Sequence, residues 1–216
     1  MNSRPVQAIL FDLDGTLVDS IRLFRDGMAH VLASYRASLD EDFFWRWHAH
    51  RLSWPELLER HGLSPIVEDS FRASVLLELS QRVQRSVAWN GSAREVLAAL
   101  RVRGLRTGIV TNAPPDHVTL IEEKLGLAEL VDVTVTGEEI GRRKKPEPFG
   151  LLLAAERIAV PPRNCLYVGD QLFDMQAAER AGMQGVLFRT PQAVDASKVA
   201  THVINSFPEL FNLLDV

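Results

Sequence analysis

The sequence contains very little cysteine. Among its 216 residues only Cys165 is a cysteine, so no internal disulfide can form. This usage is typical of proteins from a reducing compartment, and we therefore expect a cytoplasmic protein. Because Cys165 lies within a short apolar run, a place in the core is favoured over a role as a nucleophile.

Long apolar runs and an excess of positive charge are missing too. No stretch approaches the roughly 18 consecutive apolar residues of a membrane span, and the first residues lack the apolar core of a signal peptide. A net charge of −4 and a pI near 5.9 give no electrostatic footprint for nucleic acid or an anionic membrane. We expect a monomer or small homo-oligomer with neither kind of partner.

The sequence does contain a series of short apolar runs separated by helical patterns. The first run, VQAILF at residues 6–11, is nearly continuous, which indicates a strand buried on both faces of a parallel sheet. Similar runs end near residues 111, 137, 170 and 190, and a weaker one at 201–206 indicates an edge strand. Helical patterns over 92–104, 117–127, 146–158 and 173–183 alternate with them. The alternation predicts an α/β fold with a doubly wound parallel sheet.

Residues 18–86 interrupt this alternation. They show no convincing strand and indicate several helices, for example over 20–35 and 64–86, around a tryptophan-rich stretch at 42–57. We expect an inserted α-helical cap domain at 18–86, with 1–17 and 87–216 forming the α/β core. The aromatic residues are expected to pack the cap helices or a subunit contact. The alternative is that polar neighbours (Arg46, His48, His50 and Arg51) select the substrate.

Polar residues follow three of the predicted strands. Asp12 and Asp14 follow the first, Thr111 and Asn112 the second, and Asp170 the fourth, with Asp174 one helical turn further on. In open α/β sheets, ligands bind outside the carboxyl ends of the strands. We therefore expect these side chains to converge at one edge of the sheet.

Such a group of carboxylates would repel itself without a counter-charge. A hard divalent cation resolves the repulsion, and Mg²⁺ prefers a few carboxylates together with water and phosphate oxygens. Lys145, which precedes Pro146 in a basic loop, supplies a compact positive charge suited to phosphate. The sequence thus predicts a site for an anionic substrate bridged by a metal ion.

The same residues occur in the order and spacing of four family motifs. DLDGTL at 12–17 resembles the first motif of the haloacid dehalogenase-like hydrolases, and Thr111-Asn112 resembles the second. KPEP at 145–148 resembles the third, and Gly169-Asp170 with Asp174 resembles the fourth. The helical block stands where this family carries its cap. Within the family the chain is most similar to the phosphoglycolate phosphatase-like branch. It departs at Gln171, where relatives often have serine.

The resemblance implies a Rossmann-like core and a phosphatase that acts on small phosphate monoesters. Asp12 would be the nucleophile that forms an aspartyl-phosphate. Asp14 would protonate the leaving group and then activate water. Mg²⁺ would be bound by Asp12, by the backbone carbonyl of Asp14 and by Asp170.

Supporting roles also follow from the resemblance. Thr111, the backbone of Asn112 and Lys145 would stabilise the transferring phosphoryl group. Asp174 would support the metal or hold Lys145. A phosphorylated metabolite resembling phosphoglycolate is the expected substrate.

Other functions of the same fold stay open. A sugar phosphomutase shares both aspartates, and other sugar or nucleotide phosphatases are also compatible with the motifs. A dehalogenase is disfavoured because it needs no acid at position 14, and a phosphonatase because residues 18–86 contain no lysine for a Schiff base. A non-catalytic binding protein is disfavoured by the complete set of polar residues.

Overall fold

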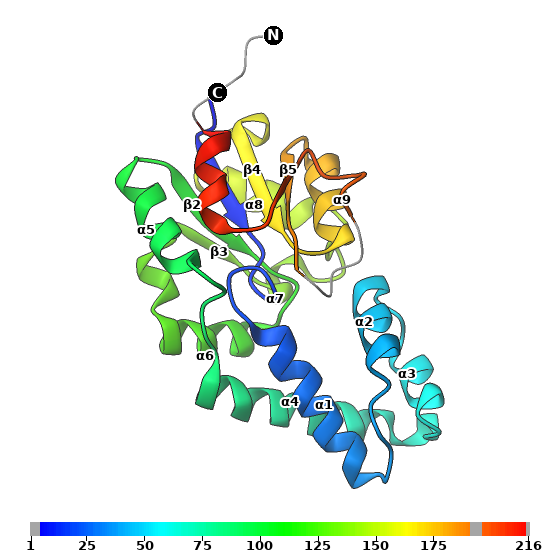
Figure 1. Cartoon of the computed structure of the whole chain (residues 1–216). Coiled ribbons are helices and arrows are strands. Elements are labelled where there is room, and N and C mark those ends of the chain that lie inside the picture. Colours follow the sequence, from blue (N-terminus) through cyan, green and yellow to red (C-terminus); the bar gives the residue numbers. More distant parts are fainter. Residues whose placement is uncertain (1–4, 191–195, 215–216) are drawn as a thin grey trace. The chain divides into compact units, whose positions relative to one another are not determined.

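The chain divides into two compact units in a computed structural model that describes residues 5–190 and 196–214 (Figure 1). One unit joins the residues up to Asp19 with those from Ala88 onward and contains the sheet. The other, Ser20–Val87, is helical. The role of the helical unit as a cap stays a prediction.

The first unit is built on a six-stranded sheet in which every neighbouring pair is parallel, with the order β3-β2-β1-β4-β5-β6. The strands are β1 (Ala8–Phe11), β2 (Arg106–Val110), β3 (Val133–Val135), β4 (Cys165–Gly169), β5 (Gln184–Phe188) and β6 (His202–Ile204). Each predicted apolar run contains one of these strands, although the strands are shorter than the runs. The order reverses beside β1, as in a doubly wound sheet. The predicted fold class is therefore confirmed.

Strand β1 is buried on both faces, which explains its unbroken apolar sequence. Ala8 and Leu10 belong to a core cluster with residues of helices α8 (Phe149–Arg157) and α9 (Leu172–Ala181). Phe11 faces the other side, where its ring lies 6.5 Å from that of Phe207. Because successive side chains of a strand point to opposite faces, both faces require apolar residues.

Helices connect the strands of this unit (Figure 1). They are α5 (Ala93–Val102), α6 (Pro115–Leu125), α7 (Gly137–Ile140), α8 (Phe149–Arg157) and α9 (Leu172–Ala181), with short 3₁₀ turns η2 (Leu127–Glu129) and η3 (Pro162–Asn164). A further 3₁₀ helix, η4 (Phe207–Leu213), follows β6. Helix α7 was not predicted, because four residues are too few to show a helical period.

The second unit consists of α1 (Ser20–Ser34), α2 (Glu41–His50), α3 (Trp54–Arg60), η1 (Pro65–Val67) and α4 (Glu68–Ser86). Asp40 caps α2 by accepting the N–H of Phe43 at 2.9 Å, and Ser53 starts α3 in a capping box with Glu56. Trp47 is buried in the core of this unit, and its indole N–H donates to the carbonyl of Ser53 at 2.9 Å. This tryptophan therefore packs the helices, as the first of the two expectations has it.

Helices long and apolar enough to cross a bilayer are not found among the described residues.

Candidate functional site

The predicted site residues follow three adjacent strands of the sheet. Asp12 continues the ladder past β1, since its N–H donates to the carbonyl of Val168 in β4 at 2.8 Å. Thr111 follows β2 on the other side of β1, and Asp170 follows β4. All three are buried. The parallel order thus places them at one carboxyl edge, where the order of the sheet reverses.

A tight turn leads the chain away from Asp12. Gly15 has φ of 82°, a left-handed conformation that glycine adopts without a steric penalty, and its N–H donates to the carbonyl of Val18 at 2.8 Å. Inside the turn the Thr16 hydroxyl donates to Oδ1 of Asp170 at 3.2 Å. The first and fourth motifs are joined through this contact, which the sequence interpretation did not foresee.

Lys145 lies at the centre of the buried charges. Its ammonium group donates to Oδ1 of Asp12 at 2.7 Å and to Oδ1 of Asp174 at 2.7 Å. It also donates to the hydroxyl of Tyr167 at 2.8 Å. The lysine side chain is only 1% exposed, so these contacts replace the water that its charge would otherwise bind.

The carboxylates gather within a small volume. Oxygen atoms of Asp12, Asp170 and Asp174 all lie within 4.8 Å of one another. Asp174 is engaged at both oxygens, because its Oδ1 accepts from Lys145 and its Oδ2 from the N–H of Gln171 at 3.1 Å. Gln171, where the sequence departs from its relatives, also donates its side-chain amide to Oδ2 of Asp170 at 2.5 Å.

The pKa values of Asp12, Asp170 and Lys145 are shifted in this buried site. Burial raises the pKa of Asp12 well above its ordinary value of 3.8, although the nearby Lys145 opposes the shift. Burial, and then the charge of Asp174, raise the pKa of Asp170 to about 7. Burial lowers the pKa of Lys145, but Asp12 and Asp174 more than offset this and leave it above its ordinary value. The site is therefore short of positive charge.

Asn112 and Thr111 both follow β2, but their side chains contact the loops rather than the carboxylates. Oδ1 of Asn112 accepts the backbone N–H of Lys145 at 3.0 Å. The hydroxyl of Thr111 accepts the N–H of Ala113 at 3.0 Å. The second motif thus anchors the loop that carries the lysine.

Asp14, which is not one of the three clustered carboxylates, contacts a histidine. Nε2 of His117, in the first turn of α6, lies 2.8 Å from Oδ1 of Asp14. Burial lowers the pKa of His117, but the charge of Asp14 and the hydrogen bond raise it above its ordinary value. His117 was not among the predicted site residues.

Three residues of the site were missed in the sequence, namely Thr16, His117 and Tyr167. A tyrosine inside a predicted buried strand was one available signal, because a buried hydroxyl needs a partner. His117 gave a weaker signal: it lies in the first turn of the helix that follows the second motif, close to the carboxyl edge.

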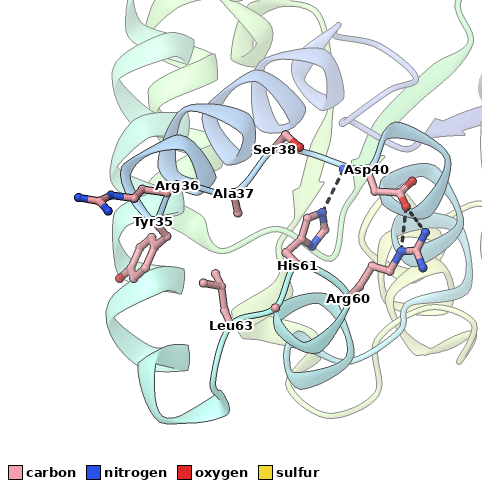
Figure 2. A pocket seen from close by; sticks show the side chains of 9 residues that line it. Tyr35, Arg36, Ala37, Ser38, Asp40, Arg60, His61 and Leu63 are labelled. Atoms are coloured by element: carbon pink, nitrogen blue, oxygen red, sulfur yellow. Dashed lines mark hydrogen bonds and ion pairs between the residues drawn. The ribbon is translucent and has the colours of Figure 1, made fainter.

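The helical unit has a cavity of its own, of about 490 Å³. Figure 2 shows that its polar side chains bind one another: Arg60 pairs with Asp40, and Nε2 of His61 accepts the N–H of Asp40 at 3.1 Å. These contacts tie α3 to the turn before α2. The polar side chains that line the cavity therefore stabilise the helical unit. The candidate site is the carboxyl edge of the sheet.

Comparisons with known proteins identify relatives of the chain. Residues 6–182 match the family model of haloacid dehalogenase-like hydrolases. The chain is 33% identical to a phosphoglycolate phosphatase of Escherichia coli (strain K12), over 84% of this chain and 80% of that protein.

Solved structures share the fold. One, described as a predicted phosphoglycolate phosphatase from Haemophilus somnus, matches with a TM-score of 0.85 and 20% identity over 96% of this chain and 97% of that one. A mutant of CbbY from Rhodobacter sphaeroides in complex with xylulose-(1,5)bisphosphate matches with a TM-score of 0.81 and 21% identity, over 98% and 100%. From its sequence, its fold and these relatives, the chain belongs to the haloacid dehalogenase-like hydrolase family and is a phosphatase of the phosphoglycolate phosphatase-like branch.

Proposed function

We propose that the enzyme hydrolyses small-molecule phosphate monoesters in a Mg²⁺-dependent reaction, with phosphoglycolate as the first substrate to test. The observation that carries this proposal is the buried Asp12, whose Oδ1 is held 2.7 Å from the ammonium group of Lys145 at the carboxyl edge. An aspartate fixed in this way is suited to attack phosphorus. The curated relatives named as phosphoglycolate phosphatases support the choice of substrate.

The reaction has two steps. An oxygen of Asp12 attacks phosphorus, the bond from phosphorus to the ester oxygen breaks, and Asp14 gives its proton to that oxygen so that an alcohol leaves. Water then attacks the aspartyl-phosphate and passes a proton to Asp14, while the bond between phosphorus and Asp12 breaks. Inorganic phosphate leaves and both aspartates return to their starting states.

Lys145 has a double task in this scheme. In the free enzyme it offsets the charge of Asp12 and Asp174. As negative charge shifts from Asp12 onto the phosphoryl oxygens, the same ammonium group can stabilise it there, together with Thr111 and the backbone N–H of Asn112.

The chemistry of the site fits a magnesium ion. The buried carboxylates of Asp12, Asp170 and Asp174 lie close together around the ammonium group of Lys145, and burial raises the pKa of Asp12 and of Asp170. Hard oxygen ligands of this kind suit Mg²⁺. Asp12, the backbone carbonyl of Asp14 and Asp170 would hold the ion. Asp174 would act as support, since its oxygens already accept from Lys145 and Gln171. The bound ion would neutralise charge on the transferring phosphoryl group.

The remaining expectations belong to the same proposal. A small phosphorylated metabolite would be the partner, in keeping with the xylulose bisphosphate bound by the CbbY mutant. Cys165 is a buried free thiol, which suits a cytoplasmic protein. We expect a monomer or small homo-oligomer.

The test is release of phosphate from phosphoglycolate and from p-nitrophenyl phosphate, with and without Mg²⁺. The Asp12→Asn variant should lose turnover of both esters. Asp132→Asn is a matched control, because Asp132 precedes β3 at the opposite edge of the sheet and pairs with Arg106. Near-normal turnover by Asp12→Asn, or no phosphate release by the wild type with any divalent metal, would refute the proposal.

Hydrolysis must also be distinguished from transfer to a sugar. With a hexose 1-phosphate as substrate, a phosphatase releases free hexose and phosphate, whereas a mutase yields hexose 6-phosphate. Analysis of the products therefore separates the two activities.

A further inference from the structure

The contact between Asp14 and His117 joins two segments that lie far apart in the chain. Asp14 belongs to the turn after β1, whereas His117 is the third residue of α6, the helix after β2. Pro115 begins that helix with a backbone already suited to it. Because β1 and β2 are neighbours in the sheet, the first turn of α6 comes close to the turn that carries Asp14.

The geometry of the contact is specific. Nε2 of His117 lies 2.8 Å from Oδ1 of Asp14, an ordinary hydrogen-bond distance. The imidazole side chain is 12% exposed and the carboxylate 19%. Water therefore competes only weakly for this bond, so the imidazole can hold the carboxyl group in one orientation.

The orientation of the Asp14 carboxyl group matters for its proposed role in proton transfer. Asp12 and Asp174 are held by the ammonium group of Lys145, and the imidazole of His117 holds Asp14. A group that transfers a proton must face the reacting oxygen, and a displacement of about 1 Å can cost on the order of 100-fold in rate.

We propose that His117 is a positioning residue that fixes the carboxyl group of Asp14 for proton transfer to the leaving oxygen. This inference rests on the proposed phosphatase function. His117 itself neither gives nor takes a proton: the proton that Asp14 loses to the ester oxygen in the first step returns from water in the second. The imidazole only holds Oδ1 of Asp14 through Nε2.

A positioning role has a consequence that a purely structural role lacks. The loss of Asp14 orientation should harm esters whose leaving group needs a proton and spare those whose leaving group does not. An alkoxide is a strong base and requires protonation as it leaves, whereas p-nitrophenolate is a weak base and leaves without it. The parameter kcat/KM reports the step in which the ester bond breaks.

Two variants form a matched pair for this test. His117→Gln places an amide N–H near the position of Nε2, whereas His117→Asn carries the same amide on a side chain that is one methylene shorter. For phosphoglycolate, or the alkyl phosphate with the highest wild-type kcat/KM, His117→Asn should lower kcat/KM about tenfold or more. For p-nitrophenyl phosphate the loss should stay below about threefold, and His117→Gln should restore most of the activity toward the alkyl ester.

His202→Asn is the control, because His202 also hydrogen-bonds a side chain, Gln184 at 3.0 Å, but lies in the edge strand β6. It should leave kcat/KM for both esters unchanged. Equal values for wild type and His117→Asn with both esters, or equal losses with both, would overturn the role of His117 while leaving the phosphatase intact. A wild type that hydrolyses neither ester would instead refute the proposed function and this inference with it.

Discussion

Asn112 holds the backbone of Lys145 at two points. Its Oδ1 accepts the N–H of Lys145 at 3.0 Å, and its Nδ2 donates to the carbonyl of the same residue at 3.4 Å. Asn112 thus fixes the loop between α7 and α8, and the loop in turn brings the ammonium group to Asp12. The second and third motifs work as one unit through this pair.

Replacing Asn112 with alanine should therefore displace Lys145. We expect kcat/KM for phosphate esters to fall about tenfold or more, because the ammonium group loses its fixed distance from Asp12. The free energy of unfolding should fall by about 1 kcal/mol for the lost hydrogen bonds. Phosphate release and urea denaturation measure the two effects. Asn164→Ala is the control, since the side-chain amide of Asn164 donates to the exposed Gln7; an equal effect of both substitutions would contradict the role of Asn112.

Magnesium binding should strengthen with pH. The pKa of Asp170 in the metal-free fold is raised from 3.8 to about 7, so below pH 7 the ion must displace a proton from this carboxyl group. The proton on Asp170 stabilises the metal-free fold because it removes a buried negative charge. This stabilisation is lost as the pH rises through about 7, and the metal can then bind the free carboxylate. The dissociation constant for Mg²⁺ should be about tenfold lower at pH 8 than at pH 6.

Calorimetric titration with Mg²⁺ at both pH values measures this difference. Asp170→Asn removes the titrating group and should abolish both the binding and its dependence on pH. Equal dissociation constants for the wild type at pH 6 and pH 8 would contradict the link between Asp170 and the metal.

Tyr167 should contribute to stability through its hydroxyl. The hydroxyl accepts from the ammonium group of Lys145 at 2.8 Å and donates to the carbonyl of Val110 at 3.0 Å. Tyr167→Phe removes both contacts inside the core and should lower the free energy of unfolding by about 1–3 kcal/mol. Because Asp12 and Asp174 still hold the lysine, kcat should fall less than in Lys145→Met.

Urea denaturation and the rate of phosphate release test this ranking. The matched control is Tyr35→Phe, which removes a hydroxyl from a half-buried tyrosine of the helical unit. It should change the free energy of unfolding and the rate of phosphate release only slightly. If Tyr167→Phe were as stable as the wild type, the hydroxyl would not be needed to satisfy the buried lysine.

The sequence predicted the parts of the site that depend on the backbone alone. Once β1 and β4 are recognised as neighbouring parallel strands, Asp12 and Asp170 must meet, because both follow the carboxyl ends. The turn at Gly15 and the strands within the apolar runs were predictable because they depend on the local sequence. The fold class was predictable on the same basis.

The contacts of long side chains were not predictable in this way. The position of the Lys145 ammonium group depends on four side-chain torsions and on the loop at 141–148 between α7 and α8. The sequence therefore indicated that Lys145 binds anions but did not reveal its hydrogen bond to Tyr167. His117 was missed because its contact with Asp14 depends on how the first turn of α6 is rotated, which a single sequence does not specify.

Gly169 leaves space for Asp174, and a methyl group at this position should damage the site. A Cβ atom on Gly169 would lie 2.5 Å from both Cβ and Cγ of Asp174, much closer than carbon atoms can approach. Asp174 is completely buried and holds Lys145, so it cannot move without breaking that contact. Gly169→Ala should therefore lower the free energy of unfolding by about 1–3 kcal/mol and reduce kcat sharply.

Gly185→Ala provides the comparison in the neighbouring strand β5. There the nearest atom to an added Cβ is the sulfur of Met175 at 3.2 Å, at the flexible end of a side chain that can move aside. This variant should keep its activity and most of its stability. Urea denaturation and phosphate release on both variants give the answer: wild-type activity in Gly169→Ala would mean that Asp174 can leave its place without loss, and its proposed hold on Lys145 would then be wrong.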